Sequence, residues 1–138
     1  MKPSLRVGLR HEMSYTVPES KTVPHVFDDS AHFAVMPKVL ATAFLVGLLE
    51  RACVEALHPH LDWPTEQTVG TAISISHSAA TPPGLTVTVQ VELTAIDRRR
   101  LTFEVVAHDG VDEISRGTHE RFVIDSAAFA DAATAKAP

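Results

Sequence analysis

The chain has 138 residues, a net charge of -5 and one cysteine, Cys53. This length predicts a single domain with its own core, and one cysteine excludes an internal disulfide. The acidic balance argues against a nucleic-acid partner, since phosphate contacts need a basic face, and the lone cysteine favours a reducing compartment.

No segment predicts a secretion signal or a membrane span. Residues Met1 to Arg10 lack the apolar core of a signal peptide. The longest apolar stretch, Val39 to Leu49, is interrupted by Thr42 and is too short to cross a bilayer. We therefore expect a cytoplasmic protein with no membrane partner.

The first part of the chain predicts a strand followed by a long loop. Residues 6–17 alternate weakly between apolar and polar side chains, as an edge strand does, and Pro18 ends the pattern. Residues 18–37 are rich in Pro, Ser, Asp and His. Loops of this length are often lids or binding loops, and Phe33 within it needs a surface to cover.

A long buried helix is predicted next, over Val39 to Leu57, with Pro37 in its first turn and Pro59 beyond its end. A helix that is apolar nearly all round is a buried helix. One sheet covers only one side of such a helix, so loops or a second subunit must cover the rest. We therefore expect a two-fold homodimer.

Four strands follow the helix. The first, Thr68 to His77, alternates and predicts one face formed by Val69, Thr71, Ile73, Ile75 and His77. The others are predicted over Leu85 to Ile96, Leu101 to His108 and Asp112 to Ile124, with a hairpin at Asp109-Gly110 and Gly117 as a candidate bulge. This order predicts an α+β fold, a central helix wrapped by a curved antiparallel sheet, over residues 1–125. Residues 126–138 form an Ala-rich tail.

Two polar residues of the predicted helix are candidates for chemistry. Glu50 lies among apolar residues, where a buried carboxylate suits a base or nucleophile; the alternative is an ion pair with Arg51. Thr42 is the only hydroxyl of the helix, and its alternative is the helix N-cap. Eight residues of continuous helix separate the two by about 12 Å, too far for a direct hydrogen bond.

The strands supply further candidates. His77 suits proton transfer, or else makes a structural hydrogen bond. Gly70 allows a ligand close to the backbone, or else marks a bulge or a helix-packing contact. Arg121 is a ligand contact or a cross-strand ion pair. His58 and His60 lack an acidic or cysteine partner, so we expect no metal site.

Several runs of residues together resemble the fluoroacetyl-CoA thioesterase family. They are Leu40 to Thr42, Gly47 to Glu50, Val69 to Ala72, Thr81 to Thr88 and His108 to Arg121, within a likeness extending from about Arg6 to Ile124. The resemblance implies a dimeric hotdog fold that hydrolyses acyl-CoA thioesters without a cofactor, coenzyme A being part of the substrate. It implies that Thr42, Glu50 and His77 are catalytic, that Gly70 and Arg121 contact the substrate, and that Phe33 and Met36 belong to a lid over the acyl pocket.

Met36 stands where the family has a second lid phenylalanine, so the choice between fluoroacetyl-CoA and other short acyl-CoA substrates stays open. Three rival functions on this fold stay open too: a non-catalytic acyl-CoA-binding protein, an enoyl-CoA hydratase or dehydratase, and an interaction subunit. Glu50 as nucleophile and Glu50 as general base are both retained.

Overall fold

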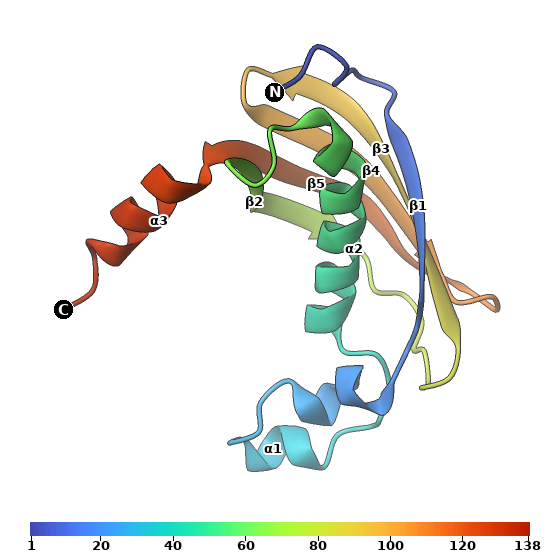
Figure 1. Ribbon diagram of the computed structural model, residues 1–138. Coiled ribbons are helices and arrows are strands. Elements are labelled where there is room, and N and C mark those ends of the chain that lie inside the picture. The colour runs from blue at the N-terminus through green and yellow to red at the C-terminus, as the bar shows by residue number, and fades with distance from the viewer.

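The computed structural model describes residues 1–138 as one curved sheet wrapped around one long helix (Figure 1). The strands are β1 (Arg10–Thr16), β2 (Glu66–Ile75), β3 (Thr86–Asp97), β4 (Arg100–His108) and β5 (Glu113–Asp125), and the helices are α1 (Ala31–Ala34), α2 (Thr42–Leu57) and α3 (Ser126–Thr134). Short 3-10 helices cover Glu19–Lys21, Val23–His25 and His58–His60. None of the helices is long and apolar enough to cross a membrane.

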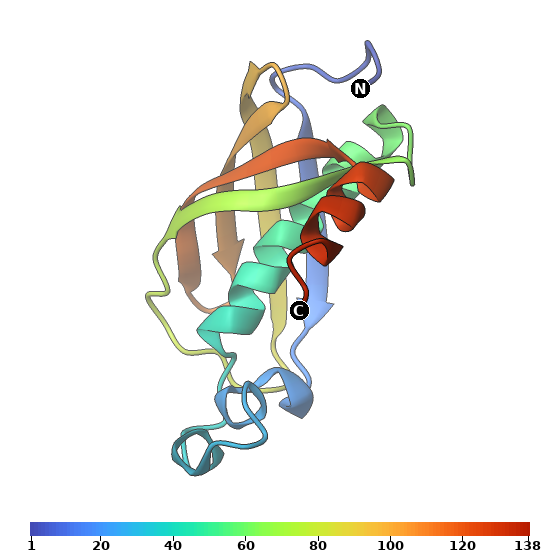
Figure 2. The same cartoon turned by 90° about the vertical axis from the view of Figure 1, so that its left-hand side faces the viewer.

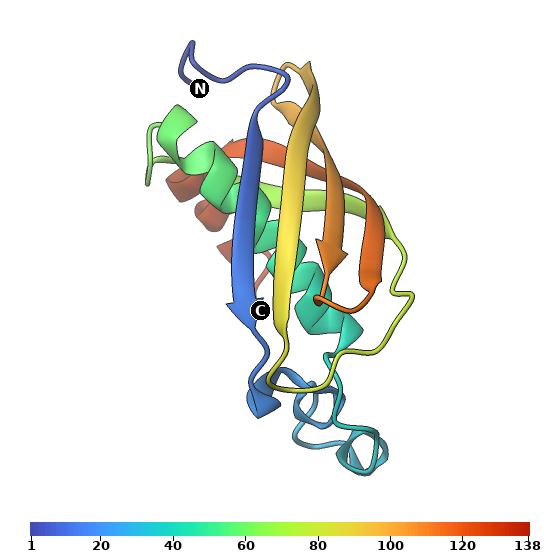
Figure 3. The ribbon, with the colours of Figure 1, turned by 90° about the vertical axis from the view of Figure 1, so that its right-hand side faces the viewer.

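The sheet is antiparallel throughout, in the order β1-β3-β4-β5-β2, so β1 is an edge strand as predicted. The alternation predicted for β3 and β4 is confirmed, because every second residue is buried against α2: Val87, Val89, Val91, Leu93, Leu101, Phe103 and Val105. Figure 3 shows β1, β3 and β4 side by side with α2 behind them.

Helix α2 begins at Thr42, three residues later than predicted, and Pro37 is not in its first turn. The preceding residues are extended: Leu40 pairs with Thr22 in an isolated bridge and donates its amide to the carbonyl of Thr81, 2.8 Å away. Ala41, with ψ 142°, is the N-cap. The interpretation of Thr42 as N-cap is therefore wrong, and its hydroxyl is free for another partner.

Only one side of α2 is covered by the chain itself. Leu45, Leu49 and Ala52 are fully buried against the sheet. On the opposite side Ala43 and Gly47 are exposed and Val46 and Val54 are half-buried. The ribbon shows no element over this side in the N-terminal half of the helix (Figures 1 and 2). The expectation that one sheet leaves part of the helix uncovered is confirmed.

Strand β2 contains a bulge directly after Gly70, the residue that the sequence offered as a possible bulge. The pairing with β5 runs from Gly70 opposite Arg121 directly to Ala72 opposite Glu120, so Thr71 is the extra residue. The bulge reverses the alternation, and the predicted face combining Val69 and Thr71 with Ile73 is wrong. Gly117 is not a bulge: a Cβ there would lie 2.0 Å from the carbonyl oxygen of Ser74, so close strand packing requires the glycine.

The predicted lid-like loop and tail both contain short helices. Within residues 18–37, α1 is a single turn begun by Ser30, whose hydroxyl accepts from the amide of Phe33. The tail forms α3, capped by the carboxylate of Asp125, and none of its residues is buried. Figure 1 shows α3 projecting away from the sheet.

Candidate active site

The first polar pair lies at the start of α2. Thr42 Oγ1 is 2.8 Å from Nδ1 of His77, which follows the end of β2. His77 is held in place on both sides, because the amides of Ser76 and Ser78 donate to the carbonyls of Arg116 and Ile114 in β5. Its Nε2 atom is buried without a partner, and burial lowers the pKa of the ring. The pair thus presents a neutral imidazole, suited to accepting a proton.

The second polar pair lies two turns further along α2. Arg121, with 5% of its side chain exposed, donates from Nη1 to Oε2 of Glu50 at 2.8 Å. It also donates from Nε to the hydroxyl of Thr68 and from Nη2 to the Thr68 carbonyl. A buried guanidinium needs a counter-ion, and the carboxylate of Glu50 is the one within reach of Arg121.

This geometry decides the alternatives for Glu50 and Arg121. The predicted pairing of Glu50 with Arg51 is wrong, since Arg51 donates to Glu55 one turn later. Arg121 pairs with the helix rather than across strands. The Glu50 side chain is 39% exposed, and no protein hydrogen bond reaches its Oε1. One oxygen of the carboxylate is therefore fixed and the other is open to a substrate or a water molecule.

Gly70 faces this ion pair. A Cβ at residue 70 would lie 2.9 Å from Oε2 of Glu50, 3.2 Å from Cε1 of His119 and 3.5 Å from Nη1 of Arg121. Gly70 precedes the bulge and packs against the side chain of Glu50 on α2. Both structural alternatives for Gly70 are thus present, and the missing side chain keeps open the space beside the carboxylate.

His119 is part of this group, and the sequence reasoning missed it. Its ring is 3% exposed and lies between the carbonyl of Ala72 and the guanidinium of Arg121. The signal was available: His119 and Arg121 are two residues apart in one strand and therefore point to the same face.

The three residues predicted to be catalytic form two groups within one chain. Thr42 and His77 meet, but no hydrogen bond joins them to Glu50. Because α2 is one continuous helix from Thr42 to Leu57, the two groups are about 12 Å apart along its axis. A single chain does not assemble them into one triad.

The predicted lid residues lie in the segment before α2, at the N-terminal end of that helix (Figure 1). Phe33 packs edge-on against Phe27, with 5.2 Å between ring centroids, and Met36 is 43% exposed. Near this segment a hollow of about 300 Å³ adjoins the first polar pair; its lining is Val23, Val39, Leu40, Thr42, His77, Ser78, Ala79 and Ala80. This hollow is large enough for a two-carbon acyl group.

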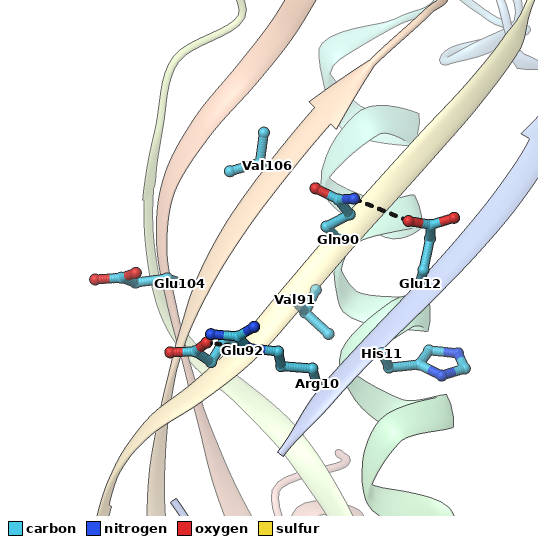
Figure 4. A pocket seen from close by; sticks show the side chains of 8 residues that line it. All are labelled: Arg10, His11, Glu12, Gln90, Val91, Glu92, Glu104 and Val106. Carbon is cyan, nitrogen blue, oxygen red and sulfur yellow. Dashed lines mark hydrogen bonds and ion pairs between the residues drawn. The ribbon is translucent and has the colours of Figure 1, made fainter. Parts of the chain in front are cut away.

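A larger hollow, of about 450 Å³, lies on the outer face of the sheet (Figure 4). Four of its polar side chains satisfy one another: Arg10 pairs with Glu92, and Gln90 donates to Glu12 at 2.8 Å. The sheet separates it from both polar groups of α2, so it is not a candidate for their chemistry. No three His, Cys, Asp or Glu side chains gather as a metal site.

Known proteins resemble this chain over most of its length. Residues 17–127 match the family described as fluoroacetyl-CoA-specific thioesterase. The fluoroacetyl-CoA thioesterase of Streptantibioticus cattleyicolor is 56% identical over 124 residues, which cover 90% of this chain and 88% of that protein. A fluoroacetyl-CoA thioesterase variant with alanine replacing a threonine, solved in complex with fluoroacetate, has a TM-score of 0.94 at 51% identity, covering 97% of this chain and 100% of that one.

The fold has more distant relatives. A hot-dog-like protein from Thermanaerovibrio acidaminovorans has a TM-score of 0.79 at 21% identity, covering 97% of this chain and 94% of that one. At this identity the likeness concerns the fold alone. Together with the helix wrapped by an antiparallel sheet, it confirms the predicted hotdog fold.

Proposed function

Because the chain belongs to the fluoroacetyl-CoA-specific thioesterase family, and is therefore a thioester hydrolase, we propose that it converts fluoroacetyl-CoA to fluoroacetate and coenzyme A. Membership of this family favours a hydrolase over the three rival functions: a non-catalytic acyl-CoA-binding protein, an enoyl-CoA hydratase or dehydratase, and an interaction subunit. The observation that carries the proposal is the Glu50 carboxylate, with Oε2 held by Arg121 and Oε1 open beside Gly70.

The proposed chemistry uses the open oxygen. Glu50 Oε1 either attacks the thioester carbonyl carbon or takes a proton from a water molecule that attacks it. In both routes the C–S bond breaks, the acyl group finally gains the water oxygen, and the coenzyme A thiolate takes up a proton. The neutral His77 ring, in contact with Thr42, is the proposed carrier of that proton. Gly70 leaves room for the carbonyl oxygen near its backbone.

We further propose that the active unit is a homodimer. Thr42, Val46 and Glu50 follow at four-residue intervals along the incompletely covered side of α2. Strand β2 pairs only with β5, so its other edge is free for another strand. A two-fold axis passing near Val46 would lay two α2 helices antiparallel. Thr42, four residues before Val46, would then face Glu50 of the partner subunit, four residues after it.

This arrangement would unite the two polar groups that one chain keeps apart. Each site would combine the Thr42–His77 pair of one protomer with Glu50 of the partner subunit. The segment with Phe33 and Met36, whose surface is exposed in one chain, is the proposed lid of the acyl pocket. A reaction without a metal or cofactor and a cytoplasmic location stay predictions.

The test of the proposed function replaces Glu50 by glutamine. The amide oxygen of Glu50→Gln still accepts from Arg121, so the buried guanidinium keeps a partner, but the amide is neither a base nor a nucleophile. We expect kcat for fluoroacetyl-CoA hydrolysis, followed by thiol release, to fall at least about 100-fold with little change in melting temperature. A rate close to that of the unaltered protein would contradict the proposal.

The matched control is Glu55→Gln. Glu55 lies on the same helix and is also bound by an arginine, Arg51 at 2.8 Å, but it faces His11 on β1 rather than Gly70. We expect its activity to stay within about twofold of the unaltered protein, since losses of 10²–10⁴ follow only from removing the acid–base group itself. Equal losses in both variants would point to a general effect of charge on the helix.

A further inference from the structure

His119 is a buried group for which the proposed chemistry has no use, yet it is in contact with the Arg121–Glu50 pair. Its Nδ1 lies 2.8 Å from the carbonyl oxygen of Ala72, and its Nε2 lies 3.0 Å from Nη1 of Arg121. Both ring nitrogens therefore have partners inside the protein.

These partners fix the protonation of the ring. A carbonyl oxygen only accepts hydrogen bonds, so Nδ1 carries the proton and donates to Ala72. A guanidinium only donates, so Nε2 is unprotonated and accepts from Arg121. His119 is thus neutral. Burial, together with the charge of Arg121, lowers the pKa of the ring in agreement with this state.

The bulge in β2 belongs to this arrangement. Thr71 is the extra residue, and Ala72 comes directly after it, at the point where the regular pairing with β5 is interrupted. The carbonyl oxygen of Ala72 accepts a hydrogen bond from the side chain of His119. The bulge therefore supplies the hydrogen-bond acceptor that sets the tautomer.

The tautomer in turn sets the position of the arginine. Nη1 of Arg121 has two hydrogens, and its two acceptors are Oε2 of Glu50 and Nε2 of His119. Thr68 holds the other side of the guanidinium through its hydroxyl and its carbonyl. Without the acceptor at His119, one Nη1 hydrogen would have no partner and the guanidinium would be free to tilt away from Glu50.

We propose that His119 is a positioning residue, whose Nε2 holds Arg121 so that the Glu50 carboxylate presents Oε1 to the substrate. This inference rests on the proposed role of Glu50. It differs from a purely structural role, in which any residue that keeps the strands packed would serve.

Two amide substitutions separate the two ring nitrogens. In His119→Gln the amide can place its oxygen where Nε2 lies and accept from Arg121. In His119→Asn the shorter amide can place its NH₂ where Nδ1 lies and donate to Ala72, but it cannot reach Arg121. We expect His119→Gln to keep kcat within about threefold and His119→Asn to lose at least about tenfold, with KM little changed in both, because misplacing a catalytic group lowers kcat steeply.

The outcomes are distinguishable from a failure of the proposed function. If the unaltered protein hydrolyses fluoroacetyl-CoA, Glu50→Gln does not, and the two His119 variants lose kcat equally or not at all, only the His119 inference is overturned. An inactive protein, or an active Glu50→Gln variant, overturns the proposed function and this inference with it. NMR spectra of the imidazole nitrogens give a second readout: Nε2 protonated and Nδ1 bare at neutral pH would also overturn the inference.

Discussion

At the scale of single residues, Gly70 has the sharpest steric constraint of the candidate site. The atom nearest to an added Cβ is Oε2 of Glu50, at 2.9 Å, the far end of a flexible side chain. Because this end is a side chain and not backbone, Gly70→Ala should lower the melting temperature less than a clash with backbone would. The same movement displaces the carboxylate from Arg121 and from the position that the proposed chemistry needs. We expect kcat to fall by about 10- to 100-fold, measured by thiol release from fluoroacetyl-CoA.

The contrasting variant is Gly117→Ala on the neighbouring strand. There the added Cβ would meet backbone atoms of Ser74 and Ile75, which cannot move without parting β2 from β5. Its expected defect is in folding, seen as a lower melting temperature. A Gly70→Ala variant with a lower melting temperature but normal activity per folded molecule would contradict the assignment of Gly70 to the site.

Two histidines, the half-buried His77 and the buried His119, make stability depend on pH. Burial lowers the pKa of His77 and of His119 below the usual value of about 6.5. Between that value and the folded pKa, the unfolded chain binds more protons than the folded chain. The free energy of unfolding therefore decreases as pH falls below about 6.5, by at most about 1.4 kcal/mol per pH unit for each histidine.

Urea unfolding from pH 8 to pH 5.5, at one protein concentration, measures this slope. The slope should become shallower in His119→Gln, because the amide does not titrate. The carboxylates with lowered pKa, such as Asp109 and Glu55, contribute in the same direction only at lower pH. A flat profile down to pH 5.5 would contradict the neutral state of both rings in the folded protein.

At the scale of elements, we predict that the segment containing α1, the proposed lid, governs the choice of acyl group. Phe33 is held by Phe27, whereas Met36 is exposed and has a flexible, unbranched side chain. A rigid aromatic ring would exclude water from a small acyl pocket more completely. We expect Met36→Phe to raise the ratio of kcat/KM for fluoroacetyl-CoA over acetyl-CoA by about 10-fold, at the lower end of the roughly 10- to 200-fold range of such pocket contacts.

Val35→Phe is the control for this prediction. Val35 is the residue next to Met36 and is 85% exposed. The Val35→Phe substitution therefore adds the same aromatic ring one position away. The selectivity ratio should not change in that variant. The measurement is kcat/KM for fluoroacetyl-CoA and for acetyl-CoA with each variant. An unchanged selectivity ratio in Met36→Phe would show that this segment has no part in acyl recognition.

How far each element could be predicted depends on whether its determinants are local. The alternation of β3 and β4 is a property of consecutive residues, so their faces were predicted correctly. The start of α2 was not, because Leu40 is kept extended by a hydrogen bond from its amide to Thr81, a distant residue. Gly70 marked a possible bulge in β2, but the face of the residues beyond it was predicted wrongly, because the bulge is defined by pairing with β5 and leaves no signal in the alternation of β2 itself.

The candidate site follows the same rule. The residue types of Thr42, Glu50 and His77, together with the family resemblance, made them candidates, and the Thr42–Glu50 separation along the helix correctly excluded a direct bond. What the sequence could not provide was the partner of each group. The pairing of Glu50 with Arg121 spans 71 residues, and the contact of Arg121 with His119 needs the face of β5 to be known.

At the scale of the whole molecule, the separation of the two polar groups is the strongest argument for a second subunit. An apolar side of α2 without cover and a free strand edge are unfavourable in water, and a two-fold partner resolves both. The same operation would bring Thr42 and His77 of one protomer to Glu50 of the partner subunit. A site divided between two chains predicts that two different inactive variants complement each other, which a site within one chain does not.

Two inactive variants should then restore activity when they share a dimer. Glu50→Gln retains the Thr42–His77 pair, and His77→Ala retains Glu50, so a mixed dimer has one site with every group intact and one site with neither. Random pairing of equal amounts makes about half of the dimers mixed, and we expect about a quarter of the unaltered activity after co-refolding. Thiol release from fluoroacetyl-CoA measures the recovery, and light scattering confirms the dimer. If each site were built within one chain, every site in the mixture would lack a group and activity would stay at the level of the separate variants.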